Sequence, residues 1–399
     1  MKQLRIAERL GQEDFLAQTL HRDYRHVMGA FTQSELDALI SFDVLSDIIA
    51  RHRLEPPRLR LAAAGDMLPL HRYATPVTTR RSTVWQRTHP NELHQRLAEG
   101  ASLVVDQIDH LHEPIGDLAA QLEAWLRATV QINAYASWTP TEGFGTHWDD
   151  HDVVIIQVQG AKRWRLYGPT RRVPLHRDVA APEPPPTEPV AELVMRPGHV
   201  LYLPRGWWHS VTADQGTHSL HLTCGLTPHT GARLLNWLAD ELLASDTFRV
   251  DLPLHADDAH QAEFLALVGR EVVAALTDPR LLHRYADAQD AQDLGRLRPS
   301  LPHLTAVPAE PGLLVRLTTG RARVADVTVE GEALVRLRGA GQEVDAAVAA
   351  APLFHRLLES GWHRLDELAQ AAGVSVADVA AVVTELVTAQ IASVRAESP

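Results

Sequence analysis

A chain of 399 residues is too long for one ordinary hydrophobic core, and at about 100–200 residues per domain it predicts two or three domains. Apolar residues make up 45% and charged residues 22%, as in soluble globular proteins, and the net charge of −12 disfavours a surface that binds nucleic acid or membranes generally. The single cysteine, Cys224, excludes an internal disulfide, and we expect a small buried side chain rather than a reactive thiol. Because no signal peptide or transmembrane run is visible, we expect a cytoplasmic protein without membrane contact.

The first 100 residues predict short helices, at residues 34–40 and 90–97, between loops rich in proline and arginine. A strand is expected at residues 102–108, followed by an amphipathic helix at residues 115–128. We find no functional motif in residues 1–100.

From residue 129 to residue 228 the pattern changes to short strands separated by turn signals. We expect strands at residues 130–136, 153–159, 163–167, 191–195, 199–203 and 218–226. Short strands at this spacing are typical of a β-sandwich or a small barrel, not of alternating strands and helices. The proline-rich stretch 181–189 predicts a surface connection.

Helical periodicity returns over residues 231–300. The remaining segments are expected as strands at 313–317, 325–329 and 333–337, a helical segment at 351–390 and a last strand at 391–394. The sequence therefore predicts an α+β protein in three parts, residues 1–230, 231–300 and 301–399.

The stretch T-H-W-D-D-H-D-V-V-I-I-Q, residues 146–157, places His147 and Asp149 two positions apart at the start of a predicted strand. Residues i and i+2 of a strand face the same side, so this imidazole and this carboxylate can reach one point. They would supply two ligands of a 2-His-1-carboxylate triad, the arrangement that binds non-haem Fe(II) and leaves other positions open. His209, which follows a strand and a Pro-Arg-Gly turn, is the candidate third ligand.

Chance is the alternative explanation, because the chain has 22 histidines and because His151 and Asp152 are competing candidates nearby. Lys162 favours a catalytic centre, since lysine occurs at only two positions and arginine supplies the other positive charges. We expect a hairpin that turns at Gly160 to bring Lys162 alongside the ligand strand. Its ammonium could then pair with the far carboxylate of an iron-chelating dicarboxylate, whereas the alternative is a solvated charge at a strand end.

These segments resemble the JmjC-type cupin oxygenases of the ribosomal oxygenase family, which hydroxylate protein side chains with Fe(II), 2-oxoglutarate and O2. The resemblance weakens outside residues 130–226. It is carried by residues 133–135, 143–167, 201–209 and 219–223.

The resemblance implies a double-stranded β-helix, the JmjC or cupin jelly roll, with His147, Asp149 and His209 as iron ligands. It implies Lys162 as the partner of the 2-oxoglutarate C5 carboxylate. Asn133 matches a position at which family members place a polar group near the metal and the cosubstrate, although an inward asparagine can simply satisfy a neighbouring backbone group.

Other polar and aromatic residues of the predicted strands are weaker candidates. His221 is expected to be a hydrogen-bonded core histidine, with a side chain that points into the barrel as the alternative. Of Trp207 and Trp208, alternation predicts one inward and one outward side chain, and the outward one lines a substrate groove or joins ordinary packing. Tyr135 and Ser219 are candidates for the border of the cosubstrate site.

Residues 363–390 have helix-turn-helix spacing, with Gly373 in the turn and Ser375 as an N-cap. The predicted second helix, residues 375–390, carries two acidic residues and no arginine or lysine, so direct DNA binding is not expected. A winged-helix-like module that packs or docks a partner fits better. The resemblance implies the same module, preceded by a helical homodimerisation region that residues 231–300 match.

The sequence therefore predicts an Fe(II)/2-oxoglutarate-dependent dioxygenase that hydroxylates a protein or peptide side chain. The resemblance favours a histidine or arginine of a ribosomal protein, and an acidic chain is compatible with a basic partner. The alternatives are a hydroxylase of a biosynthetic peptide or small molecule, a methyl-lysine demethylase and a non-catalytic cupin that binds a regulatory ligand. Cupin isomerases and cosubstrate-free dioxygenases are disfavoured, because they commonly use histidine-rich ligand sets.

Overall fold

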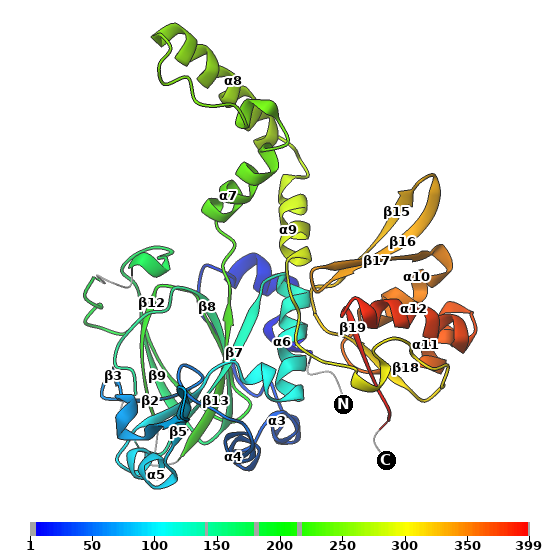
Figure 1. Cartoon of the computed structure of the whole chain (residues 1–399). Helices are drawn as coiled ribbons and strands as arrows, with labels where there is room; N and C mark the ends of the chain where they lie inside the picture. The colour runs from blue at the N-terminus through cyan, green and yellow to red at the C-terminus, as the bar shows by residue number, and fades with distance from the viewer. Residues whose placement is uncertain (1–4, 140–142, 179–182, 214–217, 398–399) are drawn as a thin grey trace. The chain divides into compact units, whose positions relative to one another are not determined.

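The computed structural model describes residues 5–139, 143–178, 183–213 and 218–397 (Figure 1). The chain divides into two compact units. The first comprises residues 1–227 with the short segment 359–362, and the second comprises residues 228–358 and 363–399. The candidate ligands all lie in the first unit.

The first unit is built on two antiparallel sheets. The larger sheet has the strand order β1-β11-β8-β13-β7-β6-β2-β3. Its strands are β1 (Arg25–Val27), β2 (Leu59–Ala63), β3 (Asp66–Met67), β6 (Ser102–Val105), β7 (Val130–Ser137), β8 (Asp152–Gln159), β11 (Val200–Leu203) and β13 (Ser219–Leu226). The smaller sheet has the order β10-β9-β12, with β9 (Lys162–Pro169), β10 (Ala191–Met195) and β12 (Trp207–Ala213).

The two sheets pack face to face and share an apolar core. Its largest members include Ile155 and Leu201 from the larger sheet and Trp164, Leu166 and Met195 from the smaller sheet. A sandwich of two antiparallel sheets, of mixed strand and helix content, is therefore the architecture of this unit, and a double-stranded β-helix of this kind was expected from the sequence.

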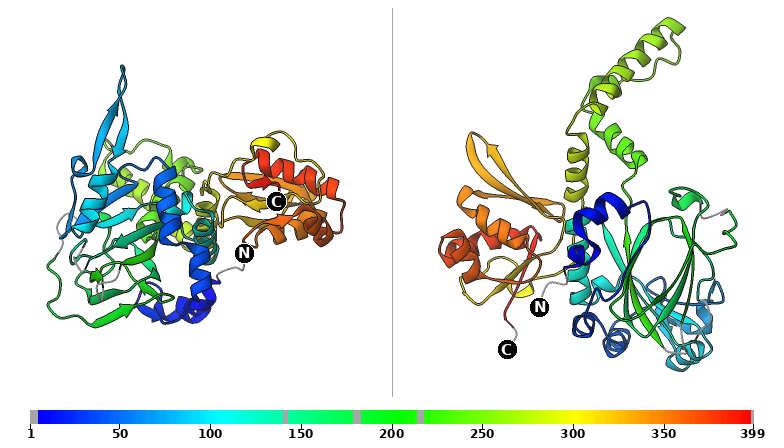
Figure 2. Two further views of the ribbon diagram at one scale, coloured as in Figure 1. Left: turned by 90° about the horizontal axis from the view of Figure 1, so that it is seen from below. Right: turned by 180° about the vertical axis from the view of Figure 1, so that it is seen from behind.

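Helices cover the outer face of the larger sheet (Figure 2). They are α1 (Ile6–Leu10), α3 (Gln33–Leu39), α4 (Phe42–Arg51), α5 (Pro90–Ala98) and α6 (Glu113–Leu126), and the short α2 (Gln12–Asp14) buries no side chain. Strand alternation divides the side chains between the two faces: Ile132 and Ala134 of β7 and Leu222 of β13 join the helices. The odd-numbered residues of β7, β8 and β13 consequently point between the sheets.

Most expected elements are present, with shifted ends. The helix predicted at 115–128 is α6, which begins earlier because Pro114 suits the first turn of a helix. The hairpin of β4 (Ala74–Thr78) and β5 (Thr83–Thr88) was not predicted, and the left view of Figure 2 shows it standing out from the body. Of the proline-rich stretch, residues 183–189 are described, and they form neither helix nor strand, while residues 181–182 lie outside the described part.

The second unit begins with three helices, α7 (Gly231–Leu242), α8 (Asp258–Leu276) and α9 (Leu281–Ala291). One three-stranded sheet pairs β18 (His363–Arg364), β14 (Leu314–Leu317) and β19 (Ala392–Arg395), and another pairs β15 (Arg323–Val329), β16 (Glu332–Gly339) and β17 (Gln342–Ala347). Strand β17 was not predicted from the sequence.

Helices α10 (Ala351–Leu357), α11 (Leu365–Ala372) and α12 (Val376–Thr388) complete the second unit. Gly373 ends α11 in a left-handed conformation and Ser375 caps α12 in a capping box, so both predicted turn positions are confirmed. In the described part of the chain no single helix is long and apolar enough to cross a membrane. Only α11 and α12 together reach that length and composition, with a bend of 109° between them.

Candidate metal centre

The two histidines predicted as ligands are joined through their backbones. The His147 amide donates to the His209 carbonyl at 3.0 Å, and the His209 amide donates to the His147 carbonyl at 2.8 Å. Two residues along, the Gly206 amide donates to the Asp149 carbonyl at 2.9 Å. The segment that carries His147 and Asp149 is therefore paired with the segment that carries His209.

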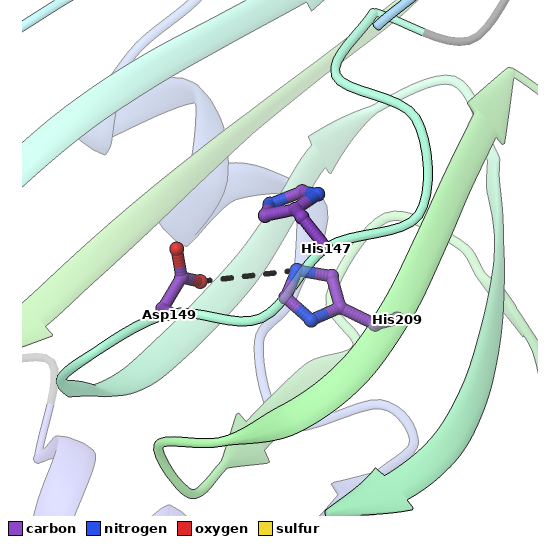
Figure 3. A group of neighbouring side chains, drawn as sticks. All are labelled: His147, Asp149 and His209. Carbon is purple, nitrogen blue, oxygen red and sulfur yellow. Dashed lines mark ion pairs between the residues drawn. The ribbon is translucent and has the colours of Figure 1, made fainter. Parts of the chain in front are cut away.

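This pairing brings the three predicted ligand side chains together (Figure 3). One ligand atom each from His147, Asp149 and His209 lies within 4.8 Å of the others. The His209 Nε2 atom is 3.8 Å from the Asp149 Oδ2 atom. In the described ranges, no other set of three His, Cys, Asp or Glu side chains is grouped in this way.

Backbone carbonyls orient both imidazoles. The His147 Nδ1 atom lies 3.1 Å from the Gly145 carbonyl oxygen, and the His209 Nδ1 atom lies 2.9 Å from the Trp207 carbonyl oxygen. A carbonyl only accepts, so each Nδ1 carries the proton and each Nε2 keeps its lone pair. Histidine ligands of metal sites are commonly held in this manner.

The protonation states suit a divalent cation. Burial raises the pKa of Asp149, but His209 and His147 outweigh this effect and hold it below its ordinary value. Burial, and then the neighbouring His147, lower the pKa of His209 to about 4. At neutral pH the group therefore presents one carboxylate and a neutral imidazole at His209, the forms that ligate metals.

Lys162 lies in the interior, but not by the route that the sequence suggested. The predicted hairpin is wrong: β8 and β9 belong to different sheets, and the turn at Gly160 carries the chain from one sheet to the other. A side chain at Gly160, which has φ +65°, would collide with the His218 carbonyl. Lys162 reaches the ligand group through β12, where Leu166 pairs with His209 and Lys162 pairs with Ala213.

The Lys162 ammonium is buried, and no partner among the described residues offsets the desolvation of its charge. Its side chain is on the face of β9 that also carries Trp164 and Leu166, and the residue is only 6% exposed. No hydrogen bond or ion pair joins it to any residue in the described ranges. Burial consequently lowers the pKa of Lys162 to about 7. The alternative of a solvated strand-end charge is wrong.

An aromatic cluster connects Lys162 with the ligand group. The Trp164 ring stacks on His209 at 5.6 Å and meets His221 edge-on at 6.0 Å. Tyr135 stacks on the other side of His221 at 5.0 Å. His221 therefore points between the sheets, and its Nδ1 atom has no hydrogen-bond partner among the described residues. The expected hydrogen-bonded core histidine is not what the structure contains.

Further interior polar atoms have no hydrogen-bond partner in the described part of the chain. They belong to inward-facing residues of β7, β8 and β9: Ser137 Oγ, Gln157 Oε1, Gln159 Oε1 and Trp164 Nε1. Buried polar groups normally have hydrogen-bond partners. A cluster of such groups without partners indicates that the interior binds a polar ligand. Ser219 differs, because its hydroxyl accepts from Gln157 Nε2 at 2.8 Å.

Asn133 is satisfied locally. Its Oδ1 atom accepts from the Gln107 amide and from Gln131 Nε2, each at 3.0 Å. The Asn133 side-chain oxygen therefore satisfies a neighbouring backbone group, which was the alternative expected from the sequence. A role of Asn133 beside the metal and the cosubstrate stays a prediction.

The remaining candidates take structural positions. Trp207 packs on Tyr24 at 5.5 Å, and Trp208 is buried with its Nε1 donating to Thr170 Oγ1. Ordinary packing thus describes both tryptophans. The competing candidates His151 and Asp152 do not join the three ligand side chains. Cys224 is fully buried in the apolar layer beneath the helices, as predicted.

Residues 109–234 match the JmjC domain family, and this range contains the whole ligand group. Among curated proteins, the chain is 35% identical over 106 residues to the bifunctional lysine-specific demethylase and histidyl-hydroxylase NO66 of Drosophila persimilis, covering 27% of this chain and 15% of that protein. It is 31% identical over 193 residues to ribosomal oxygenase 2 of Bos taurus, covering 46% of this chain and 41% of that protein. The chain thus spans less than half the length of these relatives.

The fold is similar to that of YcfD, a ribosomal oxygenase from Escherichia coli, along almost the whole chain. The structure of YcfD with cobalt and succinic acid superposes with a TM-score of 0.58 at 19% identity, covering 97% of this chain and 98% of that one. A second YcfD structure, with cobalt and 2-oxoglutarate, has the same TM-score at 18% identity. Residues 109–234 are therefore similar to JmjC domains, and the chain is similar to ribosomal oxygenases in sequence over part of its length and in fold over nearly all of it.

Proposed function

From the match of residues 109–234 to the JmjC domain family and the ligand group within that range, we propose that this protein is an Fe(II)/2-oxoglutarate-dependent oxygenase that hydroxylates a protein side chain. The observation that carries the proposal is the convergence of His147, Asp149 and His209, with the unpaired Lys162 ammonium in the same interior. When bound, Fe(II) and 2-oxoglutarate supply the oxidation, in which O2 and 2-oxoglutarate give succinate, CO2 and a hydroxylated product.

His147, Asp149 and His209 would hold the metal. The two hydrogen bonds from Nδ1 to backbone carbonyls present both Nε2 lone pairs, and the carboxylate adds one negative charge. Two imidazoles and one carboxylate are the set that leaves three adjacent positions open on a six-coordinate iron. The donor chemistry of this chain thus fits Fe(II), and cobalt in the YcfD structures is bound by a protein of the same fold.

Lys162 would anchor the distal carboxylate of 2-oxoglutarate. A buried ammonium without an anion is unfavourable, and a carboxylate at Nζ would remove that penalty. Trp164 Nε1, a donor, and His221 Nδ1 lie in the same interior without a hydrogen-bond partner among the described residues, so both are candidates for the carboxylate's remaining hydrogen bonds. The packing of Ile155, Leu166 and Leu201 around them excludes bulk water.

The substrate we propose is a histidine or arginine of a ribosomal protein. The names of the relatives support this choice, since one is a histidyl-hydroxylase and others are ribosomal oxygenases. The net charge of −12 favours encounter with a basic protein. Demethylation of a methylated lysine is the second candidate, because the NO66 relative is also named a demethylase.

We also propose that the protein is a cytoplasmic homodimer and that the C-terminal module, with α11 and α12, docks protein rather than DNA. No side chain of α8 is buried, although Leu265 and Val273 are apolar and each at least 60% exposed. A 19-residue helix of this composition is stabilised by covering its apolar face, and a second copy would cover it. The acidic α12 supports the exclusion of DNA.

The proposal is tested by succinate formation with Fe(II), 2-oxoglutarate and ribosomal proteins, combined with mass spectrometry of those proteins. We expect an added oxygen on a histidine or arginine with the wild-type protein, and no product with His147→Ala or Asp149→Ala. Succinate formation that persists undiminished in both variants would discard the assignment, and loss of a methyl group instead of oxygen addition would favour the demethylase.

A further inference from the structure

Asp152 is a buried carboxylate directly beyond the metal-ligand segment. It begins β8, three residues after Asp149, and is 3% exposed. Its side chain faces away from the ligand group, toward the helix-covered side of the larger sheet, where it meets Tyr202. Burying a carboxylate is unfavourable unless hydrogen bonds offset the loss of hydration. The groups that donate hydrogen bonds to Asp152 therefore show which segments this carboxylate holds in place.

Three groups donate to Asp152, two from β11 and the turn that follows it and one from the N-terminal segment. The Arg205 amide donates to Oδ1 at 3.1 Å. The Tyr202 hydroxyl donates to Oδ2, and the His21 ring nitrogen Nδ1 lies 2.6 Å from the same oxygen. Burial raises the pKa of Asp152, but the hydrogen bonds from His21 and Tyr202 outweigh it and hold the pKa below its ordinary value.

The hydrogen bonds of Asp152 lie next to the backbone pairing between the segment of His147 and Asp149 and the segment of His209. Backbone pairs join His147 to His209, and Asp149 to Gly206. The regular ladder between β8 and β11 ends on the other side, at the pair of Val153 with Leu203. The turn of residues 204–206 lies between these two ladders, and the Asp152 carboxylate holds its Arg205 amide.

We propose that Asp152 is a positioning residue of the metal centre: it fixes the turn of residues 204–206 and thereby the placement of His209 against His147 and Asp149. This inference rests on the proposed function only in taking those three residues as metal ligands. It gives the N-terminal segment a role, because the His21 amide donates to the Tyr202 hydroxyl at 2.8 Å and its ring contacts Asp152.

The test measures Co²⁺ binding by the full-length protein, by calorimetry and by the visible absorption of bound Co²⁺. Loss of outer partners of metal ligands typically weakens affinity about 10–100-fold. Asp152→Asn keeps an acceptor for the Arg205 amide, so we expect the Kd to rise about 10-fold, against nearer 100-fold for Asp152→Ala. The matched control is Asp150→Asn, whose carboxylate contacts His151 and His176 and should leave the Kd unchanged.

A purely structural role predicts a different result. Lower melting temperatures with wild-type Co²⁺ affinity and an unchanged Co²⁺ spectrum in both Asp152 variants would overturn the inference. Should Asp152→Ala fail to fold, Tyr202→Phe, which removes one donor, replaces it and is expected to weaken Co²⁺ binding severalfold. Tight Co²⁺ binding by the wild type without succinate formation would defeat the proposed function and leave this inference standing, whereas no Co²⁺ binding at all would defeat both.

Discussion

His147 and His209 exchange two backbone hydrogen bonds, of 3.0 and 2.8 Å, although they are distant in the sequence. The alignment of the two imidazoles therefore depends on main-chain atoms, which a change of side chain leaves in place. Each ring is additionally held by a carbonyl of its own segment, that of Gly145 or Trp207. Metal affinity and folding should consequently be separable at this site.

His147→Ala tests this separation. Because the side chain is only partly buried and the bridge is made by the backbone, we expect the melting temperature to change little. The affinity for Co²⁺ should fall by more than about 100-fold, since a ligand is worth more than the outer partners of a ligand. His151→Ala, which removes a neighbouring histidine outside the ligand group, is the control and should bind Co²⁺ normally.

Lys162→Met tests the cosubstrate anchor. Methionine keeps much of the apolar stem and removes the charge, so the space that the stem fills on the inner face of β9 stays occupied. Truncating one partner of a buried charge pair costs about 2–5 kcal/mol, so the Kd for 2-oxoglutarate in the presence of Co²⁺ should rise at least about 30-fold. The Kd for Co²⁺ alone should stay at the wild-type value. An unchanged affinity for 2-oxoglutarate would place the dicarboxylate elsewhere.

The same lysine predicts an unusual dependence of stability on pH. Burial lowers the folded-state pKa of Lys162 to about 7, below its unfolded value of 10.5, so the unfolded chain binds more protons between these values. The destabilisation is complete below pH 7 and is relieved as the pH rises toward 10.5. Without 2-oxoglutarate, the free energy of unfolding attributable to this group should therefore increase across that range.

Thermal unfolding of the wild type and of Lys162→Met across this pH range measures the effect. We expect the variant to be more stable near pH 7, by roughly 2–4 °C for each kcal/mol relieved, and the difference to shrink as the pH rises. Saturating 2-oxoglutarate with Co²⁺ should reduce the difference at pH 7 as well. A variant less stable than the wild type at pH 7 would contradict the uncompensated charge.

Local pattern was enough to predict that His147, Asp149 and His209 lie together, because alternation in a strand and a histidine after a turn are properties of short segments. Lys162 was found through its rarity in the chain. The route to it was wrong because the choice of partner strand for β9 depends on pairing with β10 and β12, which no local pattern encodes. The position of His221 beside Trp164 and Tyr135 and the hydrogen bonds of Asp152 were likewise not predicted, since each depends on atoms brought together from distant segments.

The exposed apolar positions of α8 predict the oligomeric state. Leu265 and Val273 are 65% and 60% exposed and, eight residues apart, lie on one side of the helix. We expect the wild type to elute with twice the mass of one chain in light scattering, and Leu265→Asp with Val273→Asp to elute as a monomer. Ala377→Asp adds a charge to an exposed position of α12 and should leave the mass unchanged. A monomeric wild type would exclude the dimer.

Asp290 anchors α9 within the second unit. Its Oδ1 atom lies 2.8 Å from Arg321 Nε and its Oδ2 atom lies 3.2 Å from Arg323 Nε. Asp290 and the Arg321 side chain are both nearly inaccessible to solvent. Removing one partner of a buried ion pair leaves an uncompensated charge and costs about 3–5 kcal/mol. Asp293 lies 3.9 Å from Arg321 and still offsets part of the arginine's charge. We therefore take the lower end of this range, about 3 kcal/mol, as the loss of stability.

We therefore expect Asp290→Ala to lower the melting temperature of the second unit by roughly 6–12 °C in calorimetry. Asp326→Ala, at an exposed position of β15, is the matched control and should shift stability by no more than about 0.5 kcal/mol. The ion pair of Asp290 and Arg321 joins α9 to the segment before β15, so its loss should loosen the helical region that is proposed to dimerise. Co²⁺ binding in the first unit should stay unchanged. Equal melting temperatures for Asp290→Ala and Asp326→Ala would show that the ion pair contributes nothing to holding α9.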